Sequence, residues 1–162
     1  MAQSYTRQAI SALPSDSADL ATTFSAGDYT NVSADDANYV SLADNANYGV
    51  FLFKDSNANT TDNLNASWVG SISYAASLQP VYLEAFNVNG AVWESKASNN
   101  TVGIGVDFTL RAAITTNQSN YYSSNSSAFW RVYQSVPLDA NLQFFENFPG
   151  HLGAGWGAWS SQ

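Results

Sequence analysis

Short stretches that favour β-strands alternate with polar turn clusters along most of the chain. The stretches are rich in β-branched and aromatic residues, and the segments between them are rich in Asn, Asp, Ser and Gly. Strand-like runs at this spacing are typical of a β-sandwich or a barrel. The predicted strands are residues 5–10, 38–42, 48–53, 66–72, 81–88, 91–95, 106–114 and 128–136.

The clearest hairpin signal lies in residues 80–95, where two apolar runs flank Asn89-Gly90. Asn-Gly tolerates the positive φ angles of a two-residue type I′ turn, so the pattern predicts a tight hairpin. The turn fixes the register of the two strands and places Phe86 opposite Trp93. The register in turn predicts which side chains share a face.

Both faces of this hairpin are apolar. The first face carries Val81, Leu83, Ala85 and Val92. The second carries Tyr82, Phe86, Val88 and Trp93, with Glu84. A half-solvated antiparallel strand does not need two apolar faces. Either other layers of the same chain, such as the C-terminal tail, cover the second face, or its residues Tyr82, Phe86 and Trp93 meet a partner.

Two further segments carry informative patterns. Residues 48–53 are nearly all apolar, which predicts a central strand covered on both faces. Residues 107–114 alternate between apolar and polar, which predicts a half-exposed strand. No segment keeps a 3.6-residue apolar period beyond about two turns. The best helical candidate is residues 15–24, with Ser15 or Asp16 as N-cap.

These patterns predict an all-β fold: an antiparallel β-sandwich with about eight strands over residues 1–136. Residues 137–162 are predicted to form an irregular arm rich in aromatic residues and Gly. Its bulky rings are Phe144, Phe145, Phe148, Trp156 and Trp159. Rings in such a segment need cover. The arm therefore packs on its own sandwich, docks on a neighbouring protomer, or binds a ligand.

Composition narrows the classes of function. The chain has no cysteine, which excludes disulfides, thiolate metal sites and cysteine nucleophiles. A net charge of −8 argues against binding to nucleic acid or anionic membranes. No run is long and apolar enough to span a membrane, and the N-terminus lacks the apolar core of a signal peptide.

Catalysis has little support, and no catalytic residue is predicted. The one histidine, His151, lies in the Gly-rich arm, and no Gly-x-Ser-x-Gly motif is present. Glu84 and Glu94 are the obvious carboxylate pair for glycoside hydrolysis. However, the predicted register puts them on opposite faces of the sheet, so they cannot act together unless a bulge intervenes.

The loop after residue 53 is a candidate calcium site. Its oxygen donors are Asp55, Asn57, Asn59 and Asp62. Their alternation resembles the opening of a calcium loop, but the match to an EF-hand fails at its sixth and twelfth positions. The competing interpretation is a solvated turn in which Asx side chains bond to their own backbone. No other cofactor is predicted.

Aromatic side chains offer a third kind of chemistry, since exposed Tyr and Trp rings stack on sugar faces. The candidates for ligand binding are Tyr121 and Tyr122, which lie in a polar loop, and Trp68. Most aromatic residues in strands belong to the core, so core packing is the competing interpretation for each ring.

Several motifs resemble short all-β proteins encoded by tailed phages and prophages. They include Ser67-Trp-Val69, Pro80-Val-Tyr-Leu-Glu-Ala-Phe-Asn87, Asp107-Phe-Thr-Leu110 and Arg131-Val-Tyr-Gln134. The strand pair also resembles jelly rolls of the galactose-binding type. The resemblance covers roughly residues 5–136 and implies that the antiparallel β-sandwich is jelly-roll-like. It implies no activity, because jelly rolls serve as capsid, decoration, fibre and sugar-binding modules alike.

Two functions follow as expectations. The first is a non-enzymatic virion or surface structural protein, such as a capsid decoration, head or tail component. It would be made in a bacterial cytoplasm and assemble with copies of itself or with a capsid or tail lattice. The second is a carbohydrate-binding module that recognises a receptor or glycan, for which an extracellular location is the alternative.

Overall fold

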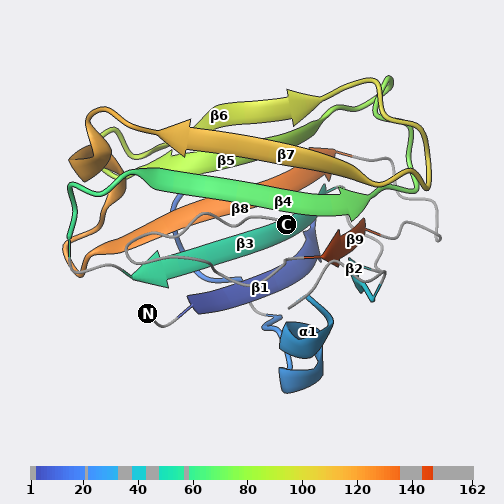
Figure 1. The fold of residues 1–162 in the computed structure, drawn as a ribbon, viewed down its shortest axis with the longest axis horizontal. Coiled ribbons are helices and arrows are strands. Elements are labelled where there is room, and N and C mark those ends of the chain that lie inside the picture. Colours follow the sequence, from blue (N-terminus) through green and yellow to red (C-terminus); the bar gives the residue numbers. More distant parts are fainter. Residues whose placement is uncertain are drawn as a thin grey trace.

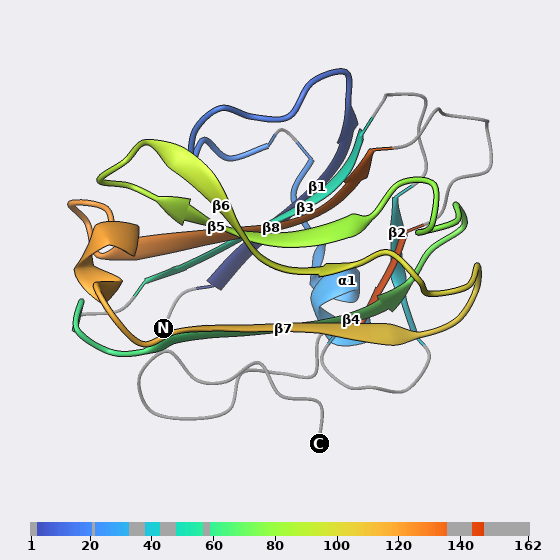
Figure 2. The same cartoon turned by 90° about the horizontal axis from the view of Figure 1, so that it is seen from above.

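Two antiparallel sheets lie face to face in the computed structural model (Figures 1 and 2). The structure describes residues 3–20, 22–32, 38–42, 48–56, 59–135 and 144–147, with backbone only for 3–5, 8–9 and 144–147. Sheet A has the strand order β1-β3-β8-β5-β6, and sheet B has the order β2-β9-β4-β7. The strands are β1 (Gln3–Ile10), β2 (Val40–Leu42), β3 (Tyr48–Ser56), β4 (Leu64–Ser71), β5 (Val81–Asn87), β6 (Val92–Asn99), β7 (Phe108–Ile114), β8 (Ser127–Ser135) and β9 (Phe144–Asn147).

The strand order is that of a jelly roll with one added edge strand. β5 pairs with β6, β4 with β7, β3 with β8 and β2 with β9, all antiparallel. These nested pairs alternate between sheets A and B, as in a long hairpin wound into a double-sheet roll. β1 extends sheet A beside β3. The predicted fold class is therefore confirmed.

All eight predicted strands are present, and a ninth was not predicted. β9 falls within the segment predicted as an irregular arm, yet it pairs with β2 and β4 inside sheet B. The sequence is rich in glycine shortly after β9, and these glycines hid the strand signal of residues 144–147. The rest of the arm, including Phe148, His151, Trp156 and Trp159, lies outside the described residues.

The predicted helix over residues 15–24 is wrong. The helix is α1 (Ala26–Asn31), and Ser25 caps it. The Ser25 hydroxyl accepts from the Asp28 N–H, and the Asp28 carboxylate accepts from the Ser25 N–H, which completes a capping box. Phe24, just before the cap, packs edge-on against Phe51 in the core. The capping box thus places the start of the helix after residue 24.

The predicted hairpin register is confirmed, although the predicted turn type is wrong. Phe86 pairs with Trp93 and Ala85 with Glu94, as expected. Positive φ falls on Ala91, at 51°, and on neither Asn89 nor Gly90. The loop therefore spans residues 88–91. A two-residue loop and a four-residue loop centred on the same peptide bond give the same strand pairing. The predicted register is therefore correct although the predicted turn type is wrong.

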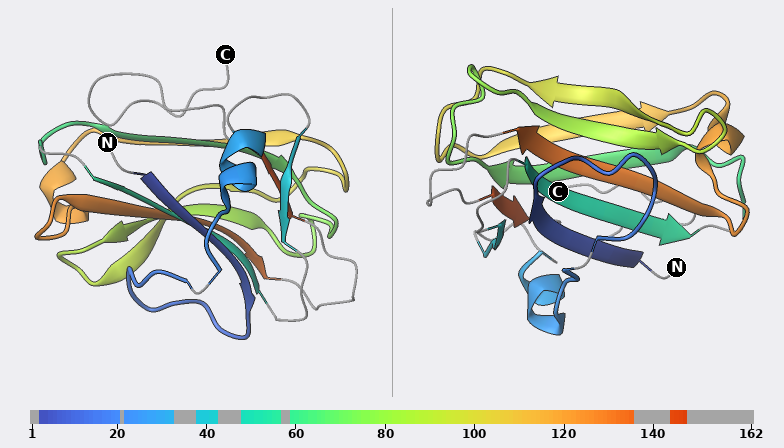
Figure 3. Two further views of the ribbon diagram at one scale, coloured as in Figure 1. Left: turned by 90° about the horizontal axis from the view of Figure 1, so that it is seen from below. Right: turned by 180° about the vertical axis from the view of Figure 1, so that it is seen from behind.

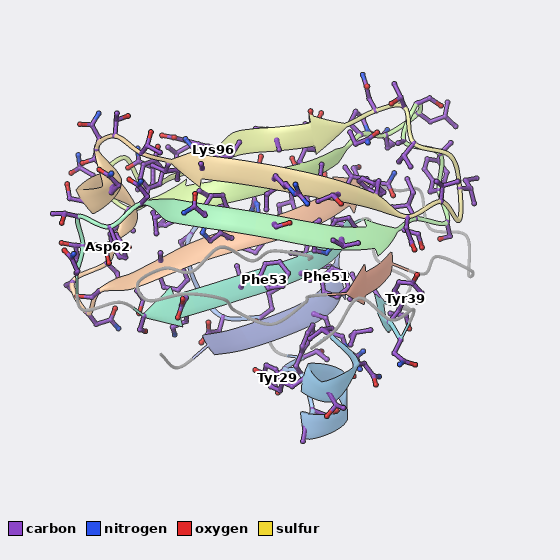
Figure 4. The ribbon with its side chains drawn as sticks, in the orientation of Figure 1. Tyr29, Tyr39, Phe51, Phe53, Asp62 and Lys96 are labelled. Atoms are coloured by element: carbon purple, nitrogen blue, oxygen red, sulfur yellow. The ribbon has the colours of Figure 1, made fainter. Side chains whose placement is uncertain are left out.

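The main core fills the space between the sheets (Figure 4, which labels Phe51 and Phe53). β3 is buried on both faces over most of its length, as its apolar run predicted. β7 alternates, with Leu110 buried and Arg111 exposed, also as predicted. Val92 departs from the expected core face: it is 47% exposed, because it begins edge strand β6 at the end of the sandwich.

Candidate functional site

A charged pair is buried on the outer face of sheet A, which faces away from sheet B. Arg131 on β8 lies opposite Glu84 on β5. Its Nε donates to Glu84 Oε2 at 2.7 Å, and its Nη2 lies 2.6 Å from the same oxygen. The two side chains are 6% and 9% exposed. Charges this deeply buried depend on each other, because removing either leaves an uncompensated ion.

Aromatic rings surround this ion pair. The Arg131 guanidinium lies 4.3 Å from the Trp93 ring and 5.1 Å from the Tyr133 ring. The Tyr133 ring also stacks on Tyr82, with centroids 5.2 Å apart and an interplanar angle of 22°. Tyr82, Trp93 and Tyr133 are half-buried. A guanidinium held between rings contributes cation–π attraction and fixes the positions of both rings.

A segment of the same chain covers part of this face. The segment between β1 and α1, described over residues 11–20 and 22–24, runs across the outer side of sheet A (Figures 2 and 3). The Pro14 carbonyl accepts from Arg131 Nη1 at 2.9 Å, and Asp19 pairs with Lys54 on β3. On this face Leu52 and Phe86 are buried. The apolar second face of the hairpin is therefore partly covered by its own chain.

The outer face of sheet A carries little net charge, because its charged side chains are paired. Burial, followed by the charge of Glu84, raises the pKa of Tyr133 to about 12. Burial lowers the pKa of Arg131, and Glu84 opposes that shift. Arginine stays protonated at any physiological pH. The face thus presents two compensated ion pairs, Arg131–Glu84 and Lys54–Asp19, beside the neutral phenol of Tyr133.

A second polar cluster lies on the opposite face of the hairpin. A bulge between the pairs at Leu83 and Glu84 makes Lys96 the extra residue of β6. Lys96 Nζ donates to Glu94 Oε2 at 2.6 Å and to the Tyr121 hydroxyl at 2.8 Å. Asn87 Nδ2 donates to Glu94 Oε1 at 2.7 Å. Glu84 and Glu94 thus point to opposite faces, as the register predicted.

Contacts within the second cluster shift the pKa values of Glu94 and Lys96. Hydrogen bonds from Lys96, then Tyr121, then Asn87 lower the pKa of Glu94 from 4.5 to about 2. Burial lowers the pKa of Lys96, but hydrogen bonds to Glu94 and Tyr121 outweigh it, and the net shift is upward. Lys96 also lies 4.8 Å from the Tyr121 ring. The cluster ties the bulged edge of sheet A to η1 (Gln118–Tyr121).

The three rings predicted to bind ligand lie in the core. Tyr121 is 8% exposed, Tyr122 6% and Trp68 0%. None of them offers a ring face to a sugar. The polar loop that favoured Tyr121 and Tyr122 folds inward through η1, an effect that composition alone does not reveal.

The calcium candidates lie in two settings. Asp55 is buried at the end of β3, where its carboxylate accepts from the Ser56 N–H at 2.7 Å. Asn59 donates to Asp62 in the exposed turn at one end of the sandwich (Figure 4). Asn57 lies outside the described residues. Within the described part of the chain, no three His, Cys, Asp or Glu side chains cluster as metal ligands do.

The predicted interface residues fall into three groups. Phe86 is buried beneath its own chain, and Tyr82 and Trp93 are half-buried beside it. Phe144 and Phe145 lie in β9, for which only the backbone is described. The other three residues, Phe148, Trp156 and Trp159, lie outside the described residues. The outer face thus keeps the aromatic character that the hairpin predicted.

An exposed aliphatic end of the sandwich was not predicted. Leu78, Ile104 and Val106 are 65%, 60% and 53% exposed. They lie in the β4–β5 and β6–β7 loops, which meet where the Gly105 N–H donates to the Ile72 carbonyl at 2.8 Å. The Gly-Ile-Gly sequence at 103–105 was the available signal, because a Gly in the third position allows a type II turn.

Both of these loops are fixed in place. The Val106 N–H donates to the Gly103 carbonyl, and Gly105 takes the positive φ of 69° that this turn requires. Gln134 is fully buried on β8 and donates from Nε2 to the carbonyls of Tyr74 and Gln79. The exposed aliphatic side chains are therefore displayed on ordered turns. We call Leu78, Ile104 and Val106 the aliphatic end.

Comparisons of the chain with models of protein families, with curated proteins and with solved structures found no match. No helix in the described ranges is long and apolar enough to cross a membrane.

Proposed function

We propose that this protein is a non-enzymatic structural component of a virion or other surface assembly. Its jelly roll packs against copies of itself in a capsid or tail lattice. The aliphatic end carries this proposal, because three large apolar side chains at 53–65% exposure stand on ordered turns. Single exposed apolar residues are ordinary, but a group of them at one end favours a protein contact.

Three further observations support the proposal. Both candidate catalytic glutamates are engaged by cations of their own chain, Glu84 by Arg131 and Glu94 by Lys96. Only 11% of the residues in the chain are charged, a composition that is common among virion and extracellular proteins. The motif resemblance to tailed-phage proteins supports a virion location, and the C-terminal arm supplies a second contact in the same assembly.

The oligomeric state in solution tests the proposal. We expect the full-length protein to form a homo-oligomer by size-exclusion chromatography with light scattering. The double variant Ile104→Ser/Val106→Ser removes two of the exposed aliphatic side chains and should shift the protein toward monomer. Val92→Ser is the matched control, because Val92 is 47% exposed at the hairpin end, away from these loops.

A wild-type protein that stays monomeric at every concentration and does not bind purified capsid or tail protein would overturn the proposal. An oligomer that the double variant leaves intact, while Val92→Ser disrupts it, would place the contact at the other end.

A further inference from the structure

We propose that the β6 side of the outer face of sheet A binds a neutral glycan, with Tyr82 and Trp93 as its aromatic contacts. The proposal is independent of assembly through the aliphatic end. It differs from the sugar site expected from the sequence, whose three rings are buried. We call the surface formed by Tyr82, Trp93, Ser95 and Ser98 the β6 ledge.

The register shows where a ring face is open. Tyr133 stacks on one face of the Tyr82 ring, so the other face lies toward β6. The residue of β6 directly opposite Tyr82 is Ser98, and the residue opposite Glu84 is Ser95. Both serines are exposed, and neither is large enough to cover the ring. The ledge thus has an aromatic wall and a floor of small hydroxyl residues.

Trp93 closes one end of the ledge on the same strand. Its ring packs on Phe86 at 5.1 Å and on the Arg131 guanidinium at 4.3 Å. Its indole Nε1 is buried and has no hydrogen-bond partner among the described residues. The packing on Phe86 and Arg131 fixes the position of the Trp93 ring at the end of the ledge.

The chemistry of the ledge matches a pyranose sugar. The C–H face of a sugar ring stacks on an aromatic face, and its hydroxyls exchange hydrogen bonds with serine side chains. The rings are held before any ligand arrives, because Arg131 is fixed by Glu84, Pro14 and the flanking rings. A site already ordered in the free protein avoids part of the entropic cost of binding.

Charge selects a neutral sugar over an acidic one. Glu84 and Arg131 compensate each other beneath the rings. Lys96, the cation nearest along β6, is bonded to Glu94 and Tyr121 on the opposite face. The net charge of −8 repels polyanions at longer range. No free cation of the ledge is therefore offered to a carboxylate or sulfate group.

Titration calorimetry with soluble oligosaccharides tests the proposal. The probes are gluco-, manno- and galacto-oligosaccharides, with oligogalacturonate as the acidic comparison. We expect at least one neutral probe to bind at micromolar to millimolar concentration and to change tryptophan fluorescence. The acidic probe should not bind.

Variants locate the site. Ser98→Tyr places a ring against the open face of Tyr82 without removing any packed side chain, and it should weaken binding about tenfold or more. Thr109→Tyr is the matched control, because Thr109 is an exposed strand residue on β7 of the other sheet. Tyr82→Ala should also weaken binding about tenfold, provided that circular dichroism shows an intact fold.

Three results would overturn the inference: no neutral probe binds at millimolar concentration, Ser98→Tyr leaves binding unchanged, or only the acidic probe binds. If Ser98→Tyr instead dissociates an oligomer and no sugar binds, the ledge is a protein contact, which also contradicts the inference. The glycan result does not depend on Ile104 or Val106, so this proposal and the assembly proposal can fail separately.

Discussion

At the scale of single residues, two glutamates on one hairpin have different fates because side chains alternate along a strand. Glu84 is buried against Arg131 on the outer face. Glu94 bonds to Lys96, Tyr121 and Asn87 on the inner face. The sequence was sufficient to separate them, since the separation needs only the register. The partners Arg131 and Tyr121 were not predictable, because they come from distant segments of the chain.

The lowered pKa of Glu94 predicts a dependence of stability on pH. The unfolded state takes up a proton near pH 4.5, whereas the folded state resists protonation until about pH 2. The contribution of Glu94 is therefore fully present above pH 4.5 and is lost as the pH falls from 4.5 toward 2. Glu94→Gln should flatten the fall of the melting temperature in this window.

Calorimetric melting curves from pH 7 to pH 2 measure this effect. Tyr121→Phe removes one of the three hydrogen bonds to Glu94, so the pH-dependent loss of stability should be smaller and should end at a higher pH than in the wild type. If the melting temperature falls equally steeply with pH in the wild type and in Glu94→Gln, the cluster does not lower the pKa of Glu94.

At the scale of elements, the β5–β6 hairpin is the innermost pair of the jelly roll. The Asn-Gly signal located its centre, and strand alternation assigned its faces. The turn itself was mispredicted because hydrogen bonds to groups outside the turn decide its shape. Asn87 accepts from the Gly90 N–H at 2.9 Å, and the Asn120 carbonyl accepts from the Asn89 N–H at 3.1 Å. Positive φ moves to Ala91 as a result.

This loop predicts different responses to substitution at two neighbouring positions. Ala91→Gly should raise the free energy of unfolding by about 1 kcal/mol, because a left-handed conformation strains any residue with a Cβ. Gly90→Ala should change it by less than about 0.5 kcal/mol, since an added Cβ would meet only ordinary contacts. Urea denaturation measures both. A type I′ turn would instead make Gly90→Ala clearly destabilising.

At the scale of the whole molecule, sheet A is the middle of three layers over β3 and β8. Sheet B covers its inner face, and the segment between β1 and α1 crosses its outer face (Figure 3). The sequence indicated this arrangement in part, because residues 48–53 and the hairpin were apolar on both faces. It did not identify the covering segment, which is polar, mostly exposed and held by a few contacts such as Pro14 to Arg131.

The covered outer face predicts that Leu52 behaves as a core residue. Leu52 is 1% exposed on the outer face, and Leu83 is 1% exposed on the inner face. Leu52→Ala should therefore lower the free energy of unfolding by about 2–5 kcal/mol, as much as Leu83→Ala. Val92→Ala serves as the exposed control and should cost less than about 0.5 kcal/mol. If Leu52→Ala lowers the free energy of unfolding only slightly, the segment between β1 and α1 does not shield the outer face from solvent.

The sequence by itself determined the fold class, eight strands, the hairpin register and the separation of Glu84 from Glu94. These features depend on local periodicity and turn position, which neighbouring residues fix. Only the tertiary structure decided which rings are buried, which segment covers sheet A, and where Leu78, Ile104 and Val106 are displayed. Those features depend on contacts between distant segments, such as Arg131 with Pro14, Gly105 with Ile72 and Gln134 with Tyr74. Such contacts leave no periodic trace along the chain.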